Sequence, residues 1–182
     1  MAGKNRNRLG KGYIQVYTGN GKGKTTAALG LAFRALGRGL KTYIGQFMKG
    51  QKYGELEAAR LVPDCIKIEQ YGKATFVHIK NPPAPVDVRM AKEGLEKARA
   101  AMLSGNYDII VLDEIITAHY FHLITLDEML EIIKQKPDGV ELIFTGRYAP
   151  AELIDAAHLV TEMTEVKHYY HEDVPARDGI ER

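Results

Sequence analysis

The sequence predicts an α/β protein in which a mostly parallel sheet of about six strands carries helices on both faces. Short β-rich segments alternate along the chain with helical segments, which is the pattern of strand–helix–strand units. A glycine-rich stretch, 18–26, directly follows the first of these strands. Consecutive apolar residues at 109–112 indicate a strand that is buried on both faces, as inner strands of parallel sheets are.

Composition narrows the class of protein. The chain has 182 residues, 45% of them hydrophobic and 26% charged, which suits one globular domain over residues 13–182. A net charge of +2 gives no electrostatic reason to expect nucleic acid as a partner. Because Cys65 is the single cysteine, an internal disulfide is excluded and a reducing cytoplasm is expected. The sequence has neither a signal-peptide pattern nor an apolar run near the roughly 20 residues that span a bilayer, so no membrane association is expected.

Residues 1–12 precede the first strand as a basic arm. The arm contains glycine and asparagine among its cationic residues, which are Lys4, Arg6, Arg8 and Lys11. This composition predicts a flexible segment. The alternative is a flap that becomes ordered over an anionic ligand.

The first strand, loop and helix predict a site for nucleotide phosphates. Residues 13–17 are β-rich, and apolar residues recur at helical spacing from Ala27 to Leu36. The glycines between them allow backbone N–H groups to form a concave anion site, and the helix N-terminus adds partial positive charge. Lys24 can place its ammonium on the terminal phosphates, and the Thr25 hydroxyl can bind Mg²⁺. The residues expected to bind nucleotide here are Thr18, Gly19, Asn20, Gly21, Lys22, Gly23, Lys24, Thr25 and Thr26.

The loop departs from the strict G-x-x-x-x-G-K-[ST] pattern, because Thr18 stands where that pattern has glycine. The alternative interpretation is a glycine-rich turn that binds nothing. A strand before the loop, a helix after it and Gly-Lys-Thr at the junction favour the phosphate site.

The next elements bring Lys49 toward this site. A strand is predicted at 41–47, and the edge where such strands end is where ligands of open α/β sheets bind. Lys49 is therefore a candidate phosphate contact, and a solvated loop lysine is the alternative. A short helix at 55–61, stopped by Pro63, and an alternating strand at 66–71 follow.

The stretch 72–87 is the least regular part of the chain. Its prolines at 82, 83 and 85 exclude a regular helix through it and predict a loop. Long loops on such scaffolds often bind substrate, which makes Phe76 a candidate contact, and packing onto the core is the alternative. A long helix is predicted at 86–104, where an apolar stripe ends before Gly105.

Asp113 and Glu114 follow the buried strand at 107–112 and predict a metal site. A carboxylate at the end of such a strand is the Walker B arrangement, in which Asp113 holds Mg²⁺ opposite Thr25, directly or through water. An apolar run followed by an acid is common by chance. The phosphate loop upstream favours the metal-binding interpretation.

The remaining elements add one further candidate, Arg147. A helix is predicted at 126–136, opened by a capping box of Thr125 and Glu128. A strand at 140–145 then ends before Arg147, which is well placed to meet a polyphosphate, while a surface arginine is the alternative. A helix at 151–156 and a strand at 158–163 follow, and residues 166–182 are polar without a clear pattern.

Two histidine pairs are spaced three residues apart, which would place each pair on one face of a helix. These pairs are His119 with His122, and His168 with His171. No cysteine accompanies either pair, so metal binding by them is not favoured.

Several motifs together resemble the P-loop family of corrinoid adenosyltransferases, which act on cob(I)alamin or cob(I)yrinic acid a,c-diamide. The resemblance runs from about residue 13 to 181, and its motifs are TGNGKGKTTAA at 18–28, QFMKG at 46–50, VLDE at 111–114, TGR at 145–147 and VKH at 166–168. The Thr18 variant of the loop is part of the likeness. The resemblance implies a RecA-like P-loop NTPase fold and a homodimer.

The resemblance also implies a reaction. ATP and Mg²⁺ (or Mn²⁺) would bind, the cobalt of a reduced corrinoid would attack the ribose C5′ carbon, and inorganic triphosphate would leave. A reductase, such as a flavodoxin-type protein, would supply the cobalt(I) state. Because cobalt(I) is itself a strong nucleophile, the protein needs positioning and electrostatics, for which Lys24, Glu114 and Arg147 are the expected catalytic residues and Thr25, Asp113 and Glu114 the expected metal ligands.

The loop at 72–87 departs from the family pattern. Some members have a Phe-x-Trp pair there that is thought to lie near the corrinoid, whereas this chain has no tryptophan and offers only Phe76. Two other functions fit the phosphate loop: an ATPase or small-molecule kinase, and a binding protein that ATP switches without turnover. The three are distinguished by what ATP becomes: triphosphate, ADP or neither.

Overall fold

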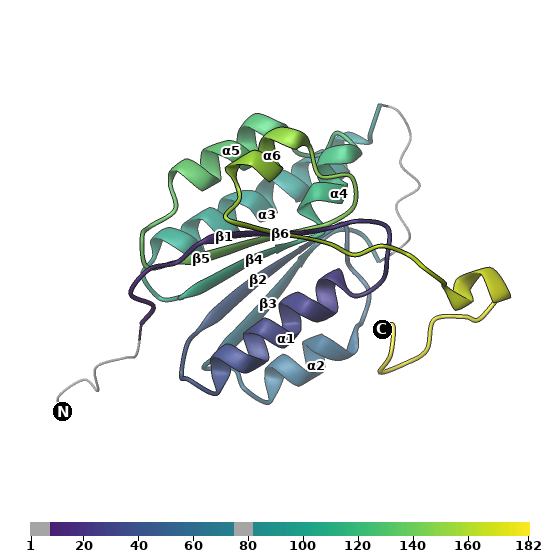
Figure 1. Cartoon of the computed structure of the whole chain (residues 1–182), viewed down its shortest axis with the longest axis horizontal. Helices are drawn as coiled ribbons and strands as arrows, with labels where there is room; N and C mark the ends of the chain where they lie inside the picture. The colour runs from purple at the N-terminus through teal and green to yellow at the C-terminus, as the bar shows by residue number, and fades with distance from the viewer. Residues whose placement is uncertain (1–7, 75–81) are drawn as a thin grey trace.

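The computed structural model describes residues 8–74 and 82–182, which form an α/β sandwich around a six-stranded sheet (Figure 1). Every strand pairing in this part of the chain is parallel, and the strand order is β3-β2-β4-β5-β1-β6. The strands are β1 (Ile14–Thr18), β2 (Thr42–Phe47), β3 (Ile66–Tyr71), β4 (Ile109–Asp113), β5 (Glu141–Thr145) and β6 (Leu159–Glu162). The predicted fold class is confirmed.

The helices cover both faces of the sheet. Figure 1 shows α1 (Lys24–Leu36) and α2 (Gly54–Arg60) on one face. The opposite face carries α3 (Pro85–Leu103), α4 (Ile115–Tyr120), α5 (Leu126–Lys134) and α6 (Ala151–Ala156). A single 3₁₀ turn, η1 (Tyr169–Glu172), lies in the segment after β6.

The sheet separates two hydrophobic clusters because successive side chains of a strand point to opposite faces. In β4, Ile109 and Val111 belong to the cluster beneath α1, whereas Ile110 and Leu112 belong to the larger cluster beneath α3 to α6. All of β4 is buried, as its continuous apolar run predicted.

Most predicted boundaries are correct within a few residues, and the differences have local causes. The helix α3 begins at Pro85, inside the stretch predicted as a loop, because proline fits the first position of a helix, where no N–H partner is needed. The capping box of Thr125 and Glu128 is confirmed, but α5 ends at Lys134 and not at residue 136. His122 has a φ of 61° and lies beyond α4, so it shares no helical face with His119.

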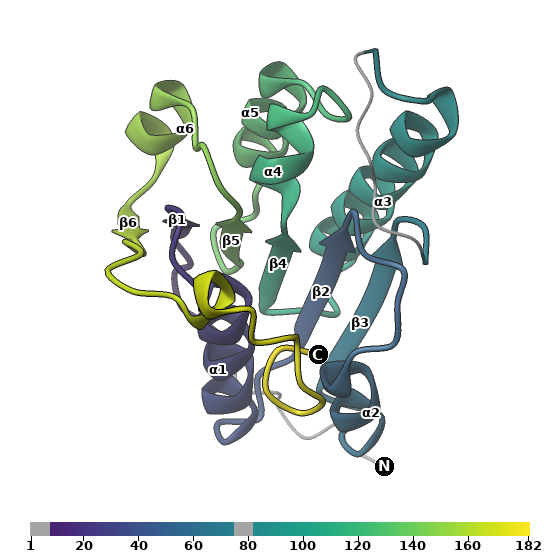
Figure 2. The same ribbon diagram turned by 90° about the vertical axis from the view of Figure 1, so that its right-hand side faces the viewer.

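Both ends of the described chain contact the domain. Within the predicted arm, Leu9 packs on the α1 side of the core, and the Gly12 N–H donates to the carbonyl of Asp138 at 2.6 Å. After β6, the chain crosses in front of α1 and ends beside α2 (Figure 2). No helix in the described ranges is long and apolar enough to cross a membrane.

Candidate nucleotide-binding site

The glycines of the loop 19–23 are required by close packing against the end of β6. A Cβ on Gly19 or Gly21 would lie 2.5 or 2.7 Å from the carbonyl oxygen of Met163, distances that side chains do not tolerate. The Gly21 N–H donates to that same oxygen at 2.6 Å. Gly19 and Gly23 also have φ values of 97° and 113°, which favour glycine. The loop is therefore held in a fixed curve between β1 and α1.

Lys24 is buried at the centre of this loop. Its ammonium donates to the carbonyl oxygens of Gly19 at 2.8 Å and of Gly21 at 2.7 Å. Burial lowers the pKa of Lys24, while the charges of Glu114 and Asp113 act in the opposite direction. An ammonium held inside the concave loop is available to neutralise a bound phosphate group.

Asp113 connects the loop to the neighbouring strands. Its carboxylate is fully buried, and one oxygen accepts hydrogen bonds from the hydroxyls of Thr25 and Thr145, both at 2.8 Å. The other oxygen accepts from Lys49 Nζ at 2.8 Å and from Gln46 Nε2 at 3.3 Å. The predicted approach of Thr25 to Asp113 is thus present in the structure.

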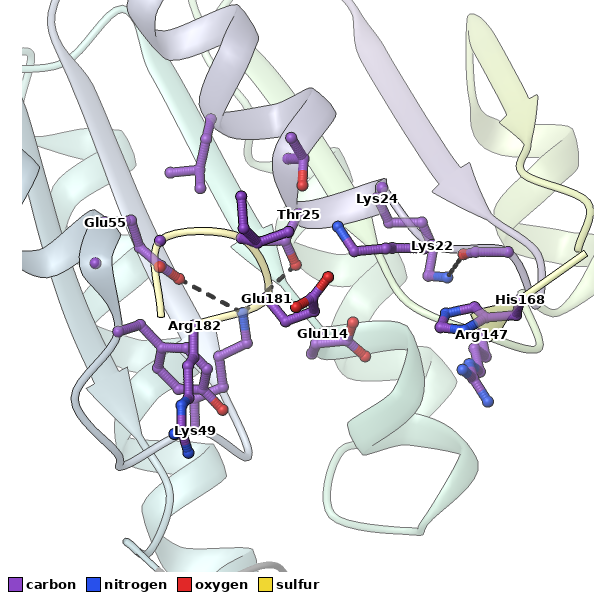
Figure 3. Close-up of a pocket in the computed structure, with 18 residues that line it drawn as sticks. Lys22, Lys24, Thr25, Lys49, Glu55, Glu114, Arg147, His168, Glu181 and Arg182 are labelled. Carbon is purple, nitrogen blue, oxygen red and sulfur yellow. Dashed lines mark hydrogen bonds and ion pairs between the residues drawn. The ribbon is translucent and has the colours of Figure 1, made fainter. Parts of the chain in front are cut away.

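The ammonium of Lys49 lies among oxygen atoms. It is 2.8 Å from Asp113 Oδ2, 3.4 Å from Thr25 Oγ1 and 3.9 Å from Glu55 Oε1 (Figure 3). Burial acts to lower the pKa of Lys49, but the charge and hydrogen bond of Asp113 outweigh it, so the pKa is raised. The side chain is 16% exposed and lies over the ring of Tyr53 at 5.2 Å. Lys49 therefore neutralises the charge of Asp113.

Thr117 fixes Glu114 and Arg147 relative to each other. Glu114 directly precedes α4 and has a φ of 62°, and its carboxylate accepts a hydrogen bond from Thr117 Oγ1 at 2.5 Å. The Arg147 N–H donates to the same hydroxyl at 3.0 Å. Between β5 and Arg147, Gly146 passes so close that a Cβ there would lie 2.6 Å from the Thr117 nitrogen. The two predicted residues therefore border one cavity.

The cavity has a volume of about 680 Å³, within the range of small-molecule sites. Much of its wall comes from residues that follow the carboxyl ends of β1, β2, β4 and β5, where ligands of such sheets bind. It is lined by Gly21, Lys22, Gly23, Lys24, Thr25, Thr26, Leu29, Lys49, Tyr53, Gly54, Glu55, Glu114, Arg147, His168, Gly179, Ile180, Glu181 and Arg182.

The cavity includes most, but not all, of the residues predicted to bind nucleotide. Thr18 and Gly19 shape the loop from behind and do not line the cavity, and Asn20 lines a separate hollow beside Arg147. Asp113 is buried beneath Thr25 and does not line the cavity itself. It accepts a hydrogen bond from Thr25, which does line the cavity. Phe76 lies outside the described residues.

Sequence reasoning missed several residues that shape the site. Thr145, Thr117 and Gln46 hold the carboxylates, while Glu55, His168 and residues 179–182 form walls. Thr145 and Gln46 lie near the carboxyl ends of predicted strands, and this position could have identified them. In the sequence, only charged residues at such positions were taken as candidates.

The donors near the loop suit a hard divalent cation. The Thr25 hydroxyl and the carboxylates of Asp113 and Glu114 are oxygen ligands, which Mg²⁺ prefers. Within the part of the chain that the structure describes, no group of three or more His, Cys, Asp or Glu side chains could hold a metal by itself. A cation here would need the hydroxyl and the phosphates of a nucleotide as further ligands.

The fold and the site together define a P-loop nucleotide-binding protein of the α/β class. The model of a family described as ATP:corrinoid adenosyltransferase BtuR/CobO/CobP matches residues 10–182, and the chain belongs to this family. The resemblance seen in the sequence motifs is confirmed by this match.

Named relatives agree with the family assignment. A corrinoid adenosyltransferase from Sinorhizobium sp is 34% identical over 94% of this chain and 80% of its own length. One from Escherichia coli (strain K12) is 31% identical, and the corrinoid adenosyltransferase CobA of Salmonella typhimurium is 32% identical; each match covers 94% of this chain and 86% of the relative. A solved KaiC-like protein from Pyrococcus horikoshii OT3 superposes with a TM-score of 0.56 at 17% identity, covering 84% of this chain and 73% of that one, which shows the shared fold.

Proposed function

We propose that this protein transfers the 5′-deoxyadenosyl group of ATP to the cobalt of a reduced corrinoid, cob(I)alamin or cob(I)yrinic acid a,c-diamide, and releases inorganic triphosphate. The observation that carries the proposal is that the family match spans every residue that lines the cavity. The cavity also has the character that the reaction needs, because basic side chains surround a phosphate-binding loop.

The main requirement of this reaction is to stabilise the triphosphate leaving group. The cobalt nucleophile needs little activation. The cobalt electron pair forms a bond to C5′ as the bond from C5′ to the α-phosphate oxygen breaks, and that bond's electron pair leaves with triphosphate. We propose that Lys24, the backbone N–H groups of the loop and Arg147 hold the triphosphate and stabilise its growing charge. Glu114 would act through its local charge and by holding a metal ion, and not as an obligatory base.

Thr25, Asp113 and Glu114 would hold Mg²⁺ or Mn²⁺, which would neutralise phosphate charge when bound. Lys49 already lies close to two of these residues. Its ammonium donates a hydrogen bond to Asp113 and lies 3.4 Å from Thr25 Oγ1. An ammonium and a divalent cation cannot share those oxygens at contact distance, since like charges repel strongly. We infer that Lys49 moves off Asp113 when metal and nucleotide bind, and that it then contacts the phosphates.

Two features of the expected enzyme rest on the family resemblance alone: a reductase, such as a flavodoxin-type protein, would deliver the cobalt(I) corrinoid, and the working form would be a homodimer. The location would be the cytoplasm, as the single cysteine suggests. We also propose that Phe76 contacts the corrinoid.

The proposal is tested by mixing the protein anaerobically with Mg-ATP and a chemically reduced corrinoid. A light-sensitive cobalt–carbon product should form with the wild-type protein and should be nearly absent with Lys24→Ala. Lys52→Ala is the matched control, because Lys52 is exposed and does not line the cavity. Equal product formation by Lys24→Ala and Lys52→Ala would contradict the site.

A further inference from the structure

The carboxyl-terminal segment forms one wall of the nucleotide cavity. Residues 179–182 line the cavity together with the phosphate loop, and the chain reaches them by crossing in front of α1 (Figures 2 and 3). The segment lies against the start of α2, because a Cβ on Gly54 would be 3.7 Å from the carbonyl oxygen of Arg182. The cavity is therefore enclosed by parts of the chain that are far apart in sequence.

This wall is a closed turn held by its own side chains. The Gly179 N–H donates to the carbonyl of Arg182 at 2.6 Å, and Gly179 has the positive φ of 77° that favours glycine. The Glu181 carboxylate accepts from the backbone N–H of Arg177 at 2.9 Å and from the hydroxyl of Tyr169. These contacts place Ile180 at a defined position on the wall.

The cavity offers both charged and apolar surface. The end at the phosphate loop is rich in cations, with Lys22, Lys24 and Arg147 among its lining residues. Leu29, Tyr53 and Ile180 provide apolar surface in the same cavity, and Ile180 is 58% exposed. Charged residues stand beside this apolar surface: Lys49, Glu55, Glu181 and Arg182. An exposed aliphatic side chain and an aromatic ring bordering one cavity are suited to the faces of a flat heterocycle.

We propose that the turn 177–182 is the nucleoside-binding wall of the cavity. In this assignment Ile180 of the turn and Tyr53, which precedes α2, both contact the adenine of ATP. The inference rests on the proposed function in taking ATP as the ligand. It adds that the carboxyl-terminal turn, and not only the phosphate loop, determines affinity for the nucleoside part.

The test compares Mg-ATP with inorganic triphosphate, which has the phosphates of ATP but no nucleoside to contact Ile180 or Tyr53. Calorimetric titrations should show that Ile180→Ala and Tyr53→Ala each weaken Mg-ATP binding by about 10-fold, because stacking and apolar contacts to a base have roughly that value. Binding of triphosphate should stay within about 2-fold of wild type, because neither side chain carries charge. The conservative variants Ile180→Leu and Tyr53→Phe should retain most of the ATP affinity.

Val166→Ala is the matched control, because Val166 lies in the same carboxyl-terminal segment, is 95% exposed and does not line the cavity. Unchanged ATP affinity in both alanine variants, or equal losses for ATP and triphosphate, would overturn the assignment of this wall. Failure of the wild-type protein to bind triphosphate would instead contradict the proposed phosphate site, so the two failures are distinguishable. Thermal melting of each variant shows whether the turn has been lost as a whole.

Discussion

Replacing Lys49 with methionine should increase the affinity of the nucleotide-free protein for divalent metal. The substitution removes the ammonium that lies 2.8 Å from Asp113 Oδ2 and 3.4 Å from Thr25 Oγ1, but keeps an unbranched apolar side chain. Without Lys49, the Asp113 carboxylate keeps the hydrogen bonds from three neutral donors, Thr25, Thr145 and Gln46. A metal ion could then approach the carboxylate without displacing a cation.

The size of the effect follows from the contact that is lost. A hydrogen bond between charged groups contributes about 1.5–3 kcal/mol, and about 1.4 kcal/mol corresponds to a tenfold change in affinity, so binding should tighten by about 10-fold to 100-fold. The same loss should lower the melting temperature of the metal-free protein by about 5 °C, because a buried carboxylate is left without a cation. Added metal should restore that temperature.

Electron paramagnetic resonance of free Mn²⁺ measures the affinity directly and needs no enzyme turnover. Lys52→Met is the control, because Lys52 is exposed nearby and does not line the cavity. Unchanged or weaker Mn²⁺ binding by Lys49→Met would show that Lys49 does not compete with the metal for Asp113.

Three further predictions concern the loop, the metal ligands and the acid range. Lys24→Ala should lower the affinity for inorganic triphosphate by about 100-fold in calorimetry, because a charge-assisted contact of a few kcal/mol is removed, while circular dichroism stays unchanged. Thr25→Ala and Asp113→Asn should each raise the Mg²⁺ concentration needed for half-maximal turnover, and their combined effect should be less than the product of the two, as expected for ligands of a shared ion; independent effects would argue against one metal site. Burial acts to raise the pKa of Glu69, but hydrogen bonds from Tyr71, Lys67 and Tyr43 lower it to about 2. Glu69 therefore stabilises the fold above its unfolded pKa of 4.5, and this stability should be lost as the pH falls toward 2, more steeply in wild type than in Glu69→Gln when unfolding is followed by denaturant titration.

The sequence was informative where local chemistry and strand position coincide. The loop 18–26 and the pair Asp113–Glu114 could be predicted because each follows a strand, and parallel strands bring their carboxyl ends to one edge of the sheet. The meeting of Thr25 with Asp113 follows from that rule alone. Arg147 was predicted at the same edge for the same reason, and it lines the cavity.

The rest of the site depends on contacts that no local pattern encodes. Nothing in the local sequence distinguishes Thr145 and Gln46 from other polar strand residues. They contact Asp113 only because β5 and β2 pair with β4 in the folded sheet. Lys49 was predicted to contact phosphate, but its pairing with Asp113 depends on the turn at Met48, where φ is 58°.

The turn 177–182 escaped prediction for a related reason. It has no apolar periodicity, and its order comes from hydrogen bonds among its own residues and from its packing against Gly54. Such a segment becomes visible as a cavity wall only when the whole chain is folded.

The fate of the ATP phosphates distinguishes adenosyl transfer from phosphoryl transfer. With reduced corrinoid present, we expect equal amounts of inorganic triphosphate and adenosylcorrinoid, with negligible ADP. A β,γ-methylene analogue of ATP should still support transfer, because the bond that breaks joins C5′ to the α-phosphate oxygen and the β–γ bridge stays intact. A kinase or ATPase would stall on that analogue. Release of ADP without corrinoid, at a rate comparable to turnover, would show that the protein is not an adenosyltransferase.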